Sequence, residues 1–343
     1  MSENAKKIDS LVIRLPNWVG DAVMATPALR SMRKGFRESR ICLIGKPGIL
    51  NLLKGLPYYD TTLEFRGRGF RPVLSLAAQL RKNRFDMGLL LPNSFSSALA
   101  FFLGGVRERV GYGLNGRNRL LHLAPLPEMD GLKRKPSPMT DYYLDLALLS
   151  GGEPTSRKME LRTEPELDAE AGRLLEMWGL GQTACRVGLN PGASFGPSKL
   201  WTPEGFARLS DQIHEELNGR TLLLCGPNET EIADAITARA NHPIVDTSRK
   251  VLPLDLLKSM IARMSAVVST DTGPRHLAAA LNVPVVVIMG PTDPRYTETN
   301  LERTTVIRKE VPCGPCHKKV CDLDHSCMTK IKSVEVFEAL VKG

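Results

Sequence analysis

The chain has 343 residues, of which 42% are hydrophobic and 24% charged, which is the balance of a globular protein long enough for two domains. Its N-terminus, "MSENAKKIDS", lacks the apolar core of a secretory signal. The most apolar windows, 96–106 and 282–290, fall short of the roughly 18 apolar residues that cross a bilayer, so we expect no membrane span.

The formal net charge of +9 is unevenly divided, because residues 1–160 hold 25 Lys/Arg against 14 Asp/Glu and residues 161–343 hold 21 against 23. Basic clusters in the first half, such as that of Arg66 and Arg68, predict a surface that meets an anion; scattered solubilising charge is the alternative. Aromatic residues that would stack on bases are sparse there and no nucleic-acid motif is present, so we expect no nucleic acid. An anionic lipid or a phosphorylated sugar fits at least as well.

Short aliphatic runs alternate with helix-like segments almost throughout, which is typical of parallel α/β units. The predicted strands are 11–16, 40–45, 86–92 and 107–113 in the first half, and 186–192, 221–226, 265–270 and 284–290 in the second. Each run stops at Gly, Pro or a small polar residue, so loops gather at the carboxyl ends of the strands, where open α/β sheets bind ligands.

The Gly-, Pro- and charge-rich stretch 150–170 indicates a linker followed by the first helix of a second domain. We therefore predict two Rossmann-like doubly wound domains with a cleft between them. The first covers residues 1–160, the second 161–330, and residues 331–343 form a final helix.

Two loops of the second half carry candidate ligand-binding groups. In "STDTGPRHLAAALN" (269–282) a strand hands over to a helix at Thr272 and Gly273, where free N–H groups beside a hydroxyl suit a phosphate and His276 faces the same end. Helix capping alone is the structural alternative. Lys199 follows another strand in a loop with Ser194 and could meet a diphosphate; a solvated lysine is the alternative.

A third loop, 225–234, places Glu229 and Glu231 at a helix start, where a carboxylate either stabilises the helix dipole or binds a ribose hydroxyl. No Walker loop is present, and no D-x-D-type carboxylate pair suggests a bound Mg²⁺. These residues lead to the hypothesis of a nucleotide diphosphate held without a metal by helix N-termini and a lysine.

Four blocks together carry a resemblance: "NWVGDAVMATPALRSMR" (17–33), "LPNSFSSALA" (91–100), "NPGASFGPSKLWTP" (190–203) and "TDTGPRHLAAALNVPVVVIMGPTDPRYT" (270–297). In order and spacing they resemble the ADP-heptose:lipopolysaccharide heptosyltransferase family, above all its type II members. The resemblance implies a GT-B-type fold, with two Rossmann-like domains facing across a cleft. The C-terminal domain would hold the sugar nucleotide, the N-terminal domain the acceptor, and the final helix would pack back on the N-terminal domain.

The reaction that the resemblance implies is an inverting, metal-independent transfer of L-glycero-D-manno-heptose, without a cofactor. The donor is ADP-heptose, and the acceptor is Kdo-lipid A bearing one heptose, in the lipopolysaccharide core of Gram-negative bacteria. Such an acceptor is anionic and lipid-anchored, in agreement with the basic first half. The implied location is cytoplasmic, with a peripheral contact to the inner membrane.

The resemblance also implies roles for single residues. Asp21, which the sequence alone leaves as a turn or capping carboxylate, becomes the general base, and Lys199 stabilises the leaving ADP. The remaining implied contacts are Ser194, Glu231, Asp271, Thr272, Gly273 and His276 for the donor, and Asn93, Ser94, Arg66 and Arg68 for the acceptor.

Four of the seven cysteines, Cys313, Cys316, Cys321 and Cys327, lie close together near the C-terminus, whereas Cys42, Cys185 and Cys225 sit singly in apolar runs as small core residues. The C-x₂-C-x₄-C-x₅-C spacing is compact enough for four thiolates around one structural tetrahedral ion. Free or redox-labile thiols and a disulfide pair are the alternatives, and a catalytic cysteine is not expected.

Three functional alternatives stay open. A glycosyltransferase of the same family with another acceptor would share these motifs, and a sugar-nucleotide epimerase would need further cleft acids or bases beyond Asp21. A two-domain binding protein of the periplasmic type would require export, for which no signal is present.

Overall fold

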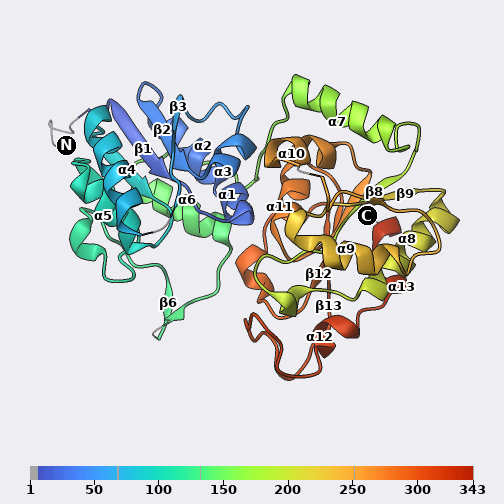
Figure 1. Ribbon diagram of the computed structural model, residues 1–343. Coiled ribbons are helices and arrows are strands. Elements are labelled where there is room, and N and C mark those ends of the chain that lie inside the picture. The colour runs from blue at the N-terminus through green and yellow to red at the C-terminus, as the bar shows by residue number, and fades with distance from the viewer. Residues whose placement is uncertain (1–6, 68, 132, 251, 343) are drawn as a thin grey trace. The chain divides into compact units, whose positions relative to one another are not determined.

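A computed structural model describes residues 7–67, 69–131, 133–250 and 252–342 (Figure 1). The chain divides after Glu160 into two compact units, each built around one parallel sheet. Among the described residues, no helix is both long and apolar enough to cross a membrane.

The sheet of the first unit has five parallel strands in the order β3-β2-β1-β4-β5. Their bounds are β1 Ser10–Arg14, β2 Arg40–Gly45, β3 Thr61–Glu64, β4 Met87–Leu90 and β5 Glu108–Val110. A two-stranded antiparallel ribbon, β6 (Met129–Asp130) with β7 (Lys133–Arg134), lies outside this sheet. The order reverses at β1, whose two neighbours are β2 and β4, so the loops after β1 and β4 flank the switch point where such sheets bind ligands.

Helices cover both faces of this sheet. Their bounds are α1 Val19–Met24, α2 Thr26–Gly35, α3 Pro47–Leu52, α4 Phe70–Asn83, α5 Phe95–Leu103, α6 Met139–Leu149 and the 3₁₀ turn η1 Asn118–Leu120. α4 packs against α5, and both share a core with Val12 and Leu90 of the strands, while α2 packs against α6. Buried strand residues on both faces explain the continuous apolar runs of the sequence.

The second unit repeats the plan with six parallel strands in the order β10-β9-β8-β11-β12-β13. The bounds are β8 Arg186–Asn190, β9 Arg220–Leu223, β10 Val245–Asp246, β11 Ala266–Thr270, β12 Val285–Met289 and β13 Thr304–Arg308. In this sheet the order reverses at β8, which lies between β9 and β11. The loops after β8 and β11 therefore flank the second switch point.

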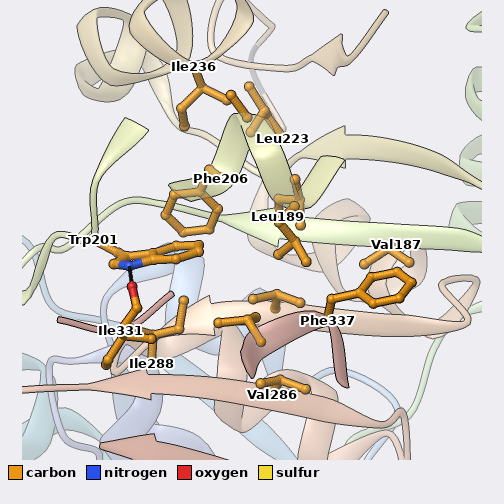
Figure 2. Close-up of a cluster of buried hydrophobic side chains, with 14 of the residues drawn as sticks. Val187, Leu189, Trp201, Phe206, Leu223, Ile236, Val286, Ile288, Ile331 and Phe337 are labelled. Atoms are coloured by element: carbon orange, nitrogen blue, oxygen red, sulfur yellow. Dashed lines mark hydrogen bonds between the residues drawn. The ribbon is translucent and has the colours of Figure 1, made fainter. Parts of the chain in front are cut away.

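The helices of this unit are α7 Pro165–Met177, α8 Pro203–Leu217, α9 Thr230–Thr237, α10 Leu254–Ala262, α11 Gly273–Ala280, α12 Ser326–Thr329 and α13 Ser333–Lys342, with 3₁₀ turns η2 Pro197–Lys199, η3 Pro227–Glu229 and η4 Pro294–Thr297. Figure 2 shows Trp201 and Phe206 in the core of this unit, where the indole N–H donates to the carbonyl of Ile331 at 3.0 Å. Phe337 brings α13 into the same core. α13 thus packs on α8, β12 and β13, and its expected contact with the first domain stays a prediction.

Candidate functional site

Asp21 follows β1 at the switch point of the first sheet, in the first turn of the six-residue helix α1. Its side chain is half-buried and accepts a hydrogen bond from the hydroxyl of Tyr143, which belongs to α6. Burial, followed by the charge of Asp21, raises the pKa of Tyr143 well above its ordinary value. Tyr143 therefore keeps its proton at neutral pH and remains a donor to the carboxylate.

α1 ends at Met24 and α2 begins at Thr26, so Asp21 lies in a short helix that is separate from α2. Thr26 begins α2, and its buried hydroxyl donates to the carbonyl of Val23 at 2.8 Å. The same oxygen accepts from the backbone N–H of Glu160 at 3.1 Å. The chain therefore begins one helix at Val19 and a second at Thr26.

Asn93 and Ser94 follow β4, the neighbour of β1, and thus stand at the same sheet edge as Asp21. The amide of Asn93 donates to the Tyr142 hydroxyl at 2.7 Å, and its oxygen accepts from Arg117 at 3.1 Å. Ser94 is the N-cap of α5, accepting from the N–H of Ser97 at 3.3 Å. Both residues thus have structural partners, and their acceptor contacts stay a prediction.

Two arginines near this edge are almost fully buried, Arg14 at 1% exposed and Arg117 at 0%. Arg14 donates to the Leu15 carbonyl at 2.6 Å and to the Asn17 side chain at 2.8 Å, and its Nε has no hydrogen-bond partner among the described residues. Arg117 donates to the Tyr112 carbonyl at 2.8 Å besides Asn93. Burial lowers the pKa of both guanidinium groups to about 10, so both stay charged at neutral pH.

The predicted basic cluster is described only in part. Arg66 is exposed and forms an ion pair with Glu64 at 2.7 Å, a pair that contributes little to stability in solvent. Arg68 lies outside the described residues.

Lys199 and Asp271 meet at the switch point of the second sheet, on the loops after β8 and β11. The Lys199 ammonium donates to Oδ2 of Asp271 at 2.7 Å and to its backbone carbonyl at 2.8 Å. The two side chains are 11% and 9% exposed, so Lys199 is not the solvated loop lysine of the alternative reading.

Asp271 collects two further donors that the sequence did not identify. Arg275, one helical turn later on α11, donates to its Oδ1 at 2.8 Å, and Thr292 donates to its Oδ2 at 2.7 Å. Burial alone would raise the pKa of Asp271, but the charges of Arg275 and Lys199 hold it well below its usual range. The carboxylate is therefore ionised at neutral pH and fixes both cations.

The start of α11 is held by a different contact from the one expected. Thr272 is its N-cap, but its hydroxyl makes no capping bond and instead accepts from the Asn190 side chain at 2.8 Å. Gly273 opens the helix behind it. His276 is buried, and desolvation followed by the charge of Arg275 lowers its pKa to about 3, so its ring is neutral at pH 7.

The remaining donor candidates lie around this edge. Ser194 and Glu231 are exposed, on the loop after β8 and in the first turn of α9. Glu229 approaches the β8 loop more closely, because its carboxylate accepts from the Gly226 N–H at 2.8 Å and lies 1.7 Å from where a Cβ on Gly192 would stand. Glu229 therefore contacts the loop after β8, and the donor contact of Glu231 stays a prediction.

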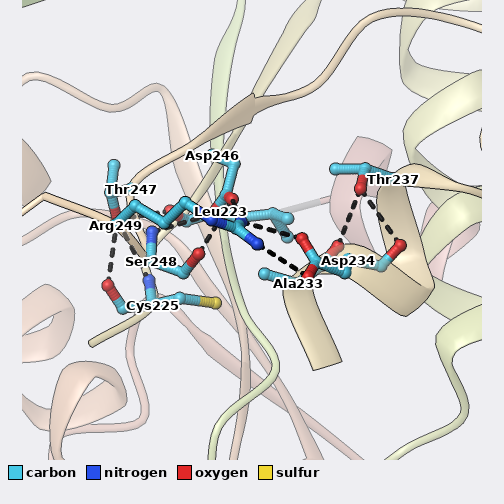
Figure 3. A network of polar contacts seen from close by, with 9 residues as sticks. All are labelled: Leu223, Cys225, Ala233, Asp234, Thr237, Asp246, Thr247, Ser248 and Arg249. Atoms are coloured by element: carbon cyan, nitrogen blue, oxygen red, sulfur yellow. Dashed lines mark hydrogen bonds and ion pairs between the residues drawn. The ribbon is translucent and has the colours of Figure 1, made fainter. Parts of the chain in front are cut away.

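Polar contacts also tie the ends of β9 and β10 together (Figure 3). Thr247 donates to the Leu223 carbonyl at 2.7 Å and accepts from the Cys225 N–H at 3.2 Å. Arg249 reaches Asp234 of α9 at 2.7 Å. This network holds the outer loops of the same sheet edge in place.

The four clustered cysteines line one cavity of about 20 Å³, together with Ser198 and Pro291. All seven cysteines are free thiols, so the disulfide reading does not describe this structure. Among the described residues, no three Cys, His, Asp or Glu side chains are already arranged to hold a metal ion. Cys42 and Cys225 are buried and Cys185 is half-buried, as small core residues should be.

Two Rossmann-like units, each with a parallel sheet, give the chain an α/β fold of the GT-B type, as in the solved structure of Escherichia coli ADP-heptose lipopolysaccharide heptosyltransferase II. That structure matches with a TM-score of 0.80 at 24% identity, over 97% of this chain and 98% of its own. A model of glycosyltransferase family 9 (heptosyltransferase) matches residues 73–326. The chain belongs to this family and is a glycosyltransferase.

Relatives of known name cover most of the chain. Lipopolysaccharide heptosyltransferase 2 of Escherichia coli strain K12 is 29% identical over 306 residues, which are 85% of this chain and 86% of the relative. Lipooligosaccharide heptosyltransferase 2 of a Campylobacter jejuni strain of serotype O:6 is 26% identical over 346 residues, 97% of this chain and 98% of the relative.

Proposed function

We propose that this glycosyltransferase moves L-glycero-D-manno-heptose from ADP-heptose to the first heptose of the lipopolysaccharide inner core, with inversion and without a catalytic metal. The names of the relatives support the substrates. The observation that carries the chemistry is the half-buried Asp21 carboxylate, which follows β1 at a switch point and accepts a hydrogen bond from Tyr143.

In the proposed reaction Asp21 takes the proton of the acceptor hydroxyl while that oxygen attacks the anomeric carbon of the donor. The bond from this carbon to the diphosphate breaks in the same displacement, and ADP leaves with the electron pair. One attack from the face opposite the leaving group inverts the anomeric centre. Tyr143 acts as a positioning residue that holds the carboxylate.

On the donor side, Lys199 and Arg275 offer positive charge where ADP develops negative charge. An ammonium has three N–H donors, so Lys199 can keep its two bonds to Asp271 and still donate to a phosphate oxygen. The N–H groups of Thr272 and Gly273 at the start of α11 would add to this, and Ser194, Glu231 and His276 stay as further donor contacts.

On the acceptor side, the first domain would bind Kdo-lipid A bearing one heptose. Asn93, Ser94 and the basic cluster with Arg66 would contact it. The excess of Lys/Arg over Asp/Glu before residue 160 supports an anionic acceptor and a peripheral contact with the inner membrane surface.

The test is incubation of the purified protein with ADP-heptose and a lipopolysaccharide that carries a single core heptose. We expect a product heavier by one heptose, with the opposite anomeric configuration by NMR, and unchanged initial rates in EDTA. A product that forms only with another acceptor would indicate a glycosyltransferase of the same family with a different acceptor. Conversion of ADP-heptose to an isomer without any acceptor would point to the epimerase.

A further inference from the structure

The segment between β13 and α12, residues 309–325, has neither helix nor strand, yet it supports the loops that carry the donor-side charges. Its Lys319 carbonyl accepts from the Ser198 N–H at 3.1 Å, and the Ser198 hydroxyl donates to the Lys318 carbonyl at 2.6 Å. The ring of His325 contacts the Ser198 carbonyl at 2.7 Å. Because Ser198 immediately precedes Lys199, these hydrogen bonds to Ser198 also restrict the position of Lys199.

The same segment supports the second partner of the ion pair. The N–H of His317 donates to the Pro291 carbonyl at 2.9 Å, and the next residue, Thr292, donates to Asp271. A seventeen-residue stretch without helix or strand needs another source of order if it is to hold two loops in fixed positions.

Three cysteines of this segment and one in α12, which follows it, provide that source. Cys313, Cys316, Cys321 and Cys327 line one cavity of about 20 Å³, whose wall also includes Ser198 and Pro291. Three of the cysteines are at least partly exposed and Cys327 is buried. An ion could therefore enter the cavity from solvent and also reach the buried thiol of Cys327. Lys318 lies near Cys316 and Cys321 and would offset the charge of thiolates.

We propose that these four cysteines bind one divalent first-row transition-metal ion as a tetrahedral thiolate centre, which fixes the loop that carries Lys199. Binding forms four sulfur–metal bonds and releases four thiol protons, with no change in oxidation state. Zn²⁺ and Fe²⁺ both accept four thiolates in this geometry. No three Cys, His, Asp or Glu side chains are arranged around a common point in the described part of the chain, so metal binding requires the thiols to move together.

The first test is elemental analysis of protein purified with reductant and without chelator. We expect one metal ion per chain, with the element deciding between zinc and iron. The double variant Cys313→Ser/Cys316→Ser should lose it, whereas Cys185→Ser, a half-buried thiol outside the cavity, should keep it. Metal that persists in the double variant would overturn the proposal.

Titration of the metal-free wild type with Co²⁺ keeps the test independent of variants that fail to fold. Sulfur-to-cobalt charge-transfer bands with tetrahedral d–d bands are expected. Their absence, with all seven thiols reactive after denaturation, would identify free thiols; four fewer reactive thiols without metal would identify disulfides, and either result overturns the centre.

Hydrogen exchange tests the positioning role without an activity assay. Metal removal should raise exchange in peptides covering 311–325 and 194–199 together, and leave exchange in 230–237, which form α9, unchanged. Faster exchange in 311–325 alone would refute the coupling to Lys199. These readouts do not depend on heptose transfer, so the centre and the proposed reaction can fail separately.

Discussion

The ammonium of Lys199 lies 2.7 Å from the carboxylate of Asp271, with both side chains nearly out of solvent. The two residues are 72 positions apart and meet because β8 and β11 are neighbours in the sheet. A buried pair of this kind is costly to break from one side, since the remaining charge keeps its desolvation cost without its partner.

Lys199→Met should lower the rate of transfer by about 10²-fold or more and the free energy of unfolding by about 1 to 3 kcal/mol. Asp271→Asn should destabilise the protein more, because it leaves two buried cations without their shared carboxylate. Denaturant unfolding of both single variants and the double variant measures this. Strictly additive losses would contradict the coupling.

Asp21→Asn should reduce transfer by about 10²- to 10⁴-fold, the usual contribution of a general base, while ADP affinity by calorimetry stays unchanged. Retained transfer would disprove the assignment of Asp21 as the base.

Tyr143→Phe should move the acidic limb of the pH profile of kcat/KM to higher pH. A carboxylate that loses a hydrogen-bond donor holds its proton more tightly, so the base is lost at a higher pH. Tyr142→Phe, the adjacent tyrosine whose hydroxyl accepts from Asn93, is the matched control and should leave this limb in place.

Gly192→Ala should push the Glu229 carboxylate off the Gly226 N–H, because its Cβ would stand 1.7 Å from Oε1 of Glu229, and so destabilise the second unit by about 1 kcal/mol and weaken ADP binding. Gly226→Ala makes a sharp comparison, since its Cβ would come no closer than 3.8 Å to the same carboxylate. Thermal melting and calorimetry should separate the two variants, and equal effects would rule out the contact as the cause.

His276 should make stability depend on pH. Its folded pKa of about 3 lies below the unfolded value of about 6.5, so the unfolded state binds the proton first as pH falls. Its contribution is complete above about pH 6.5 and should decline by about 2 kcal/mol on acidification to pH 4.5. Urea unfolding of His276→Gln should lack this part of the decline, while His122→Gln, at an exposed site, should retain it.

The apolar runs of the sequence predicted the seven strands inside the two sheets, because strands covered on both faces are continuously hydrophobic. The short edge strand β5 was predicted as well. The outer strands β3, β10 and β13 were missed. They are short or half-exposed, as in "TTLE" of β3, and so carry no such run.

The roles of Asp21, Lys199 and Asp271, which the family resemblance implies, stay predictions. Their placement on loops at the carboxyl ends of strands was predictable from the order of the runs along the chain. Their partners were not, because the bond of Tyr143 to Asp21 and the convergence of Arg275 and Thr292 on Asp271 depend on how helices pack on the sheets. The i,i+4 spacing of Asp271 and Arg275 was the one local signal that could have revealed a member of the cluster.

Arg14 and Arg117 give the first unit an electrostatic property that its surface does not reveal. Their contacts are with carbonyl and amide oxygens, which solvate a cation without neutralising it. These two guanidinium charges, set against the single carboxylate of Asp21 at the same edge, thus stand behind the ends of β1 and β4 in a medium that screens them poorly. The potential at this edge should stay positive at salt concentrations that suppress the attraction of exposed lysines and arginines, so an acidic ligand would be favoured there even at high ionic strength.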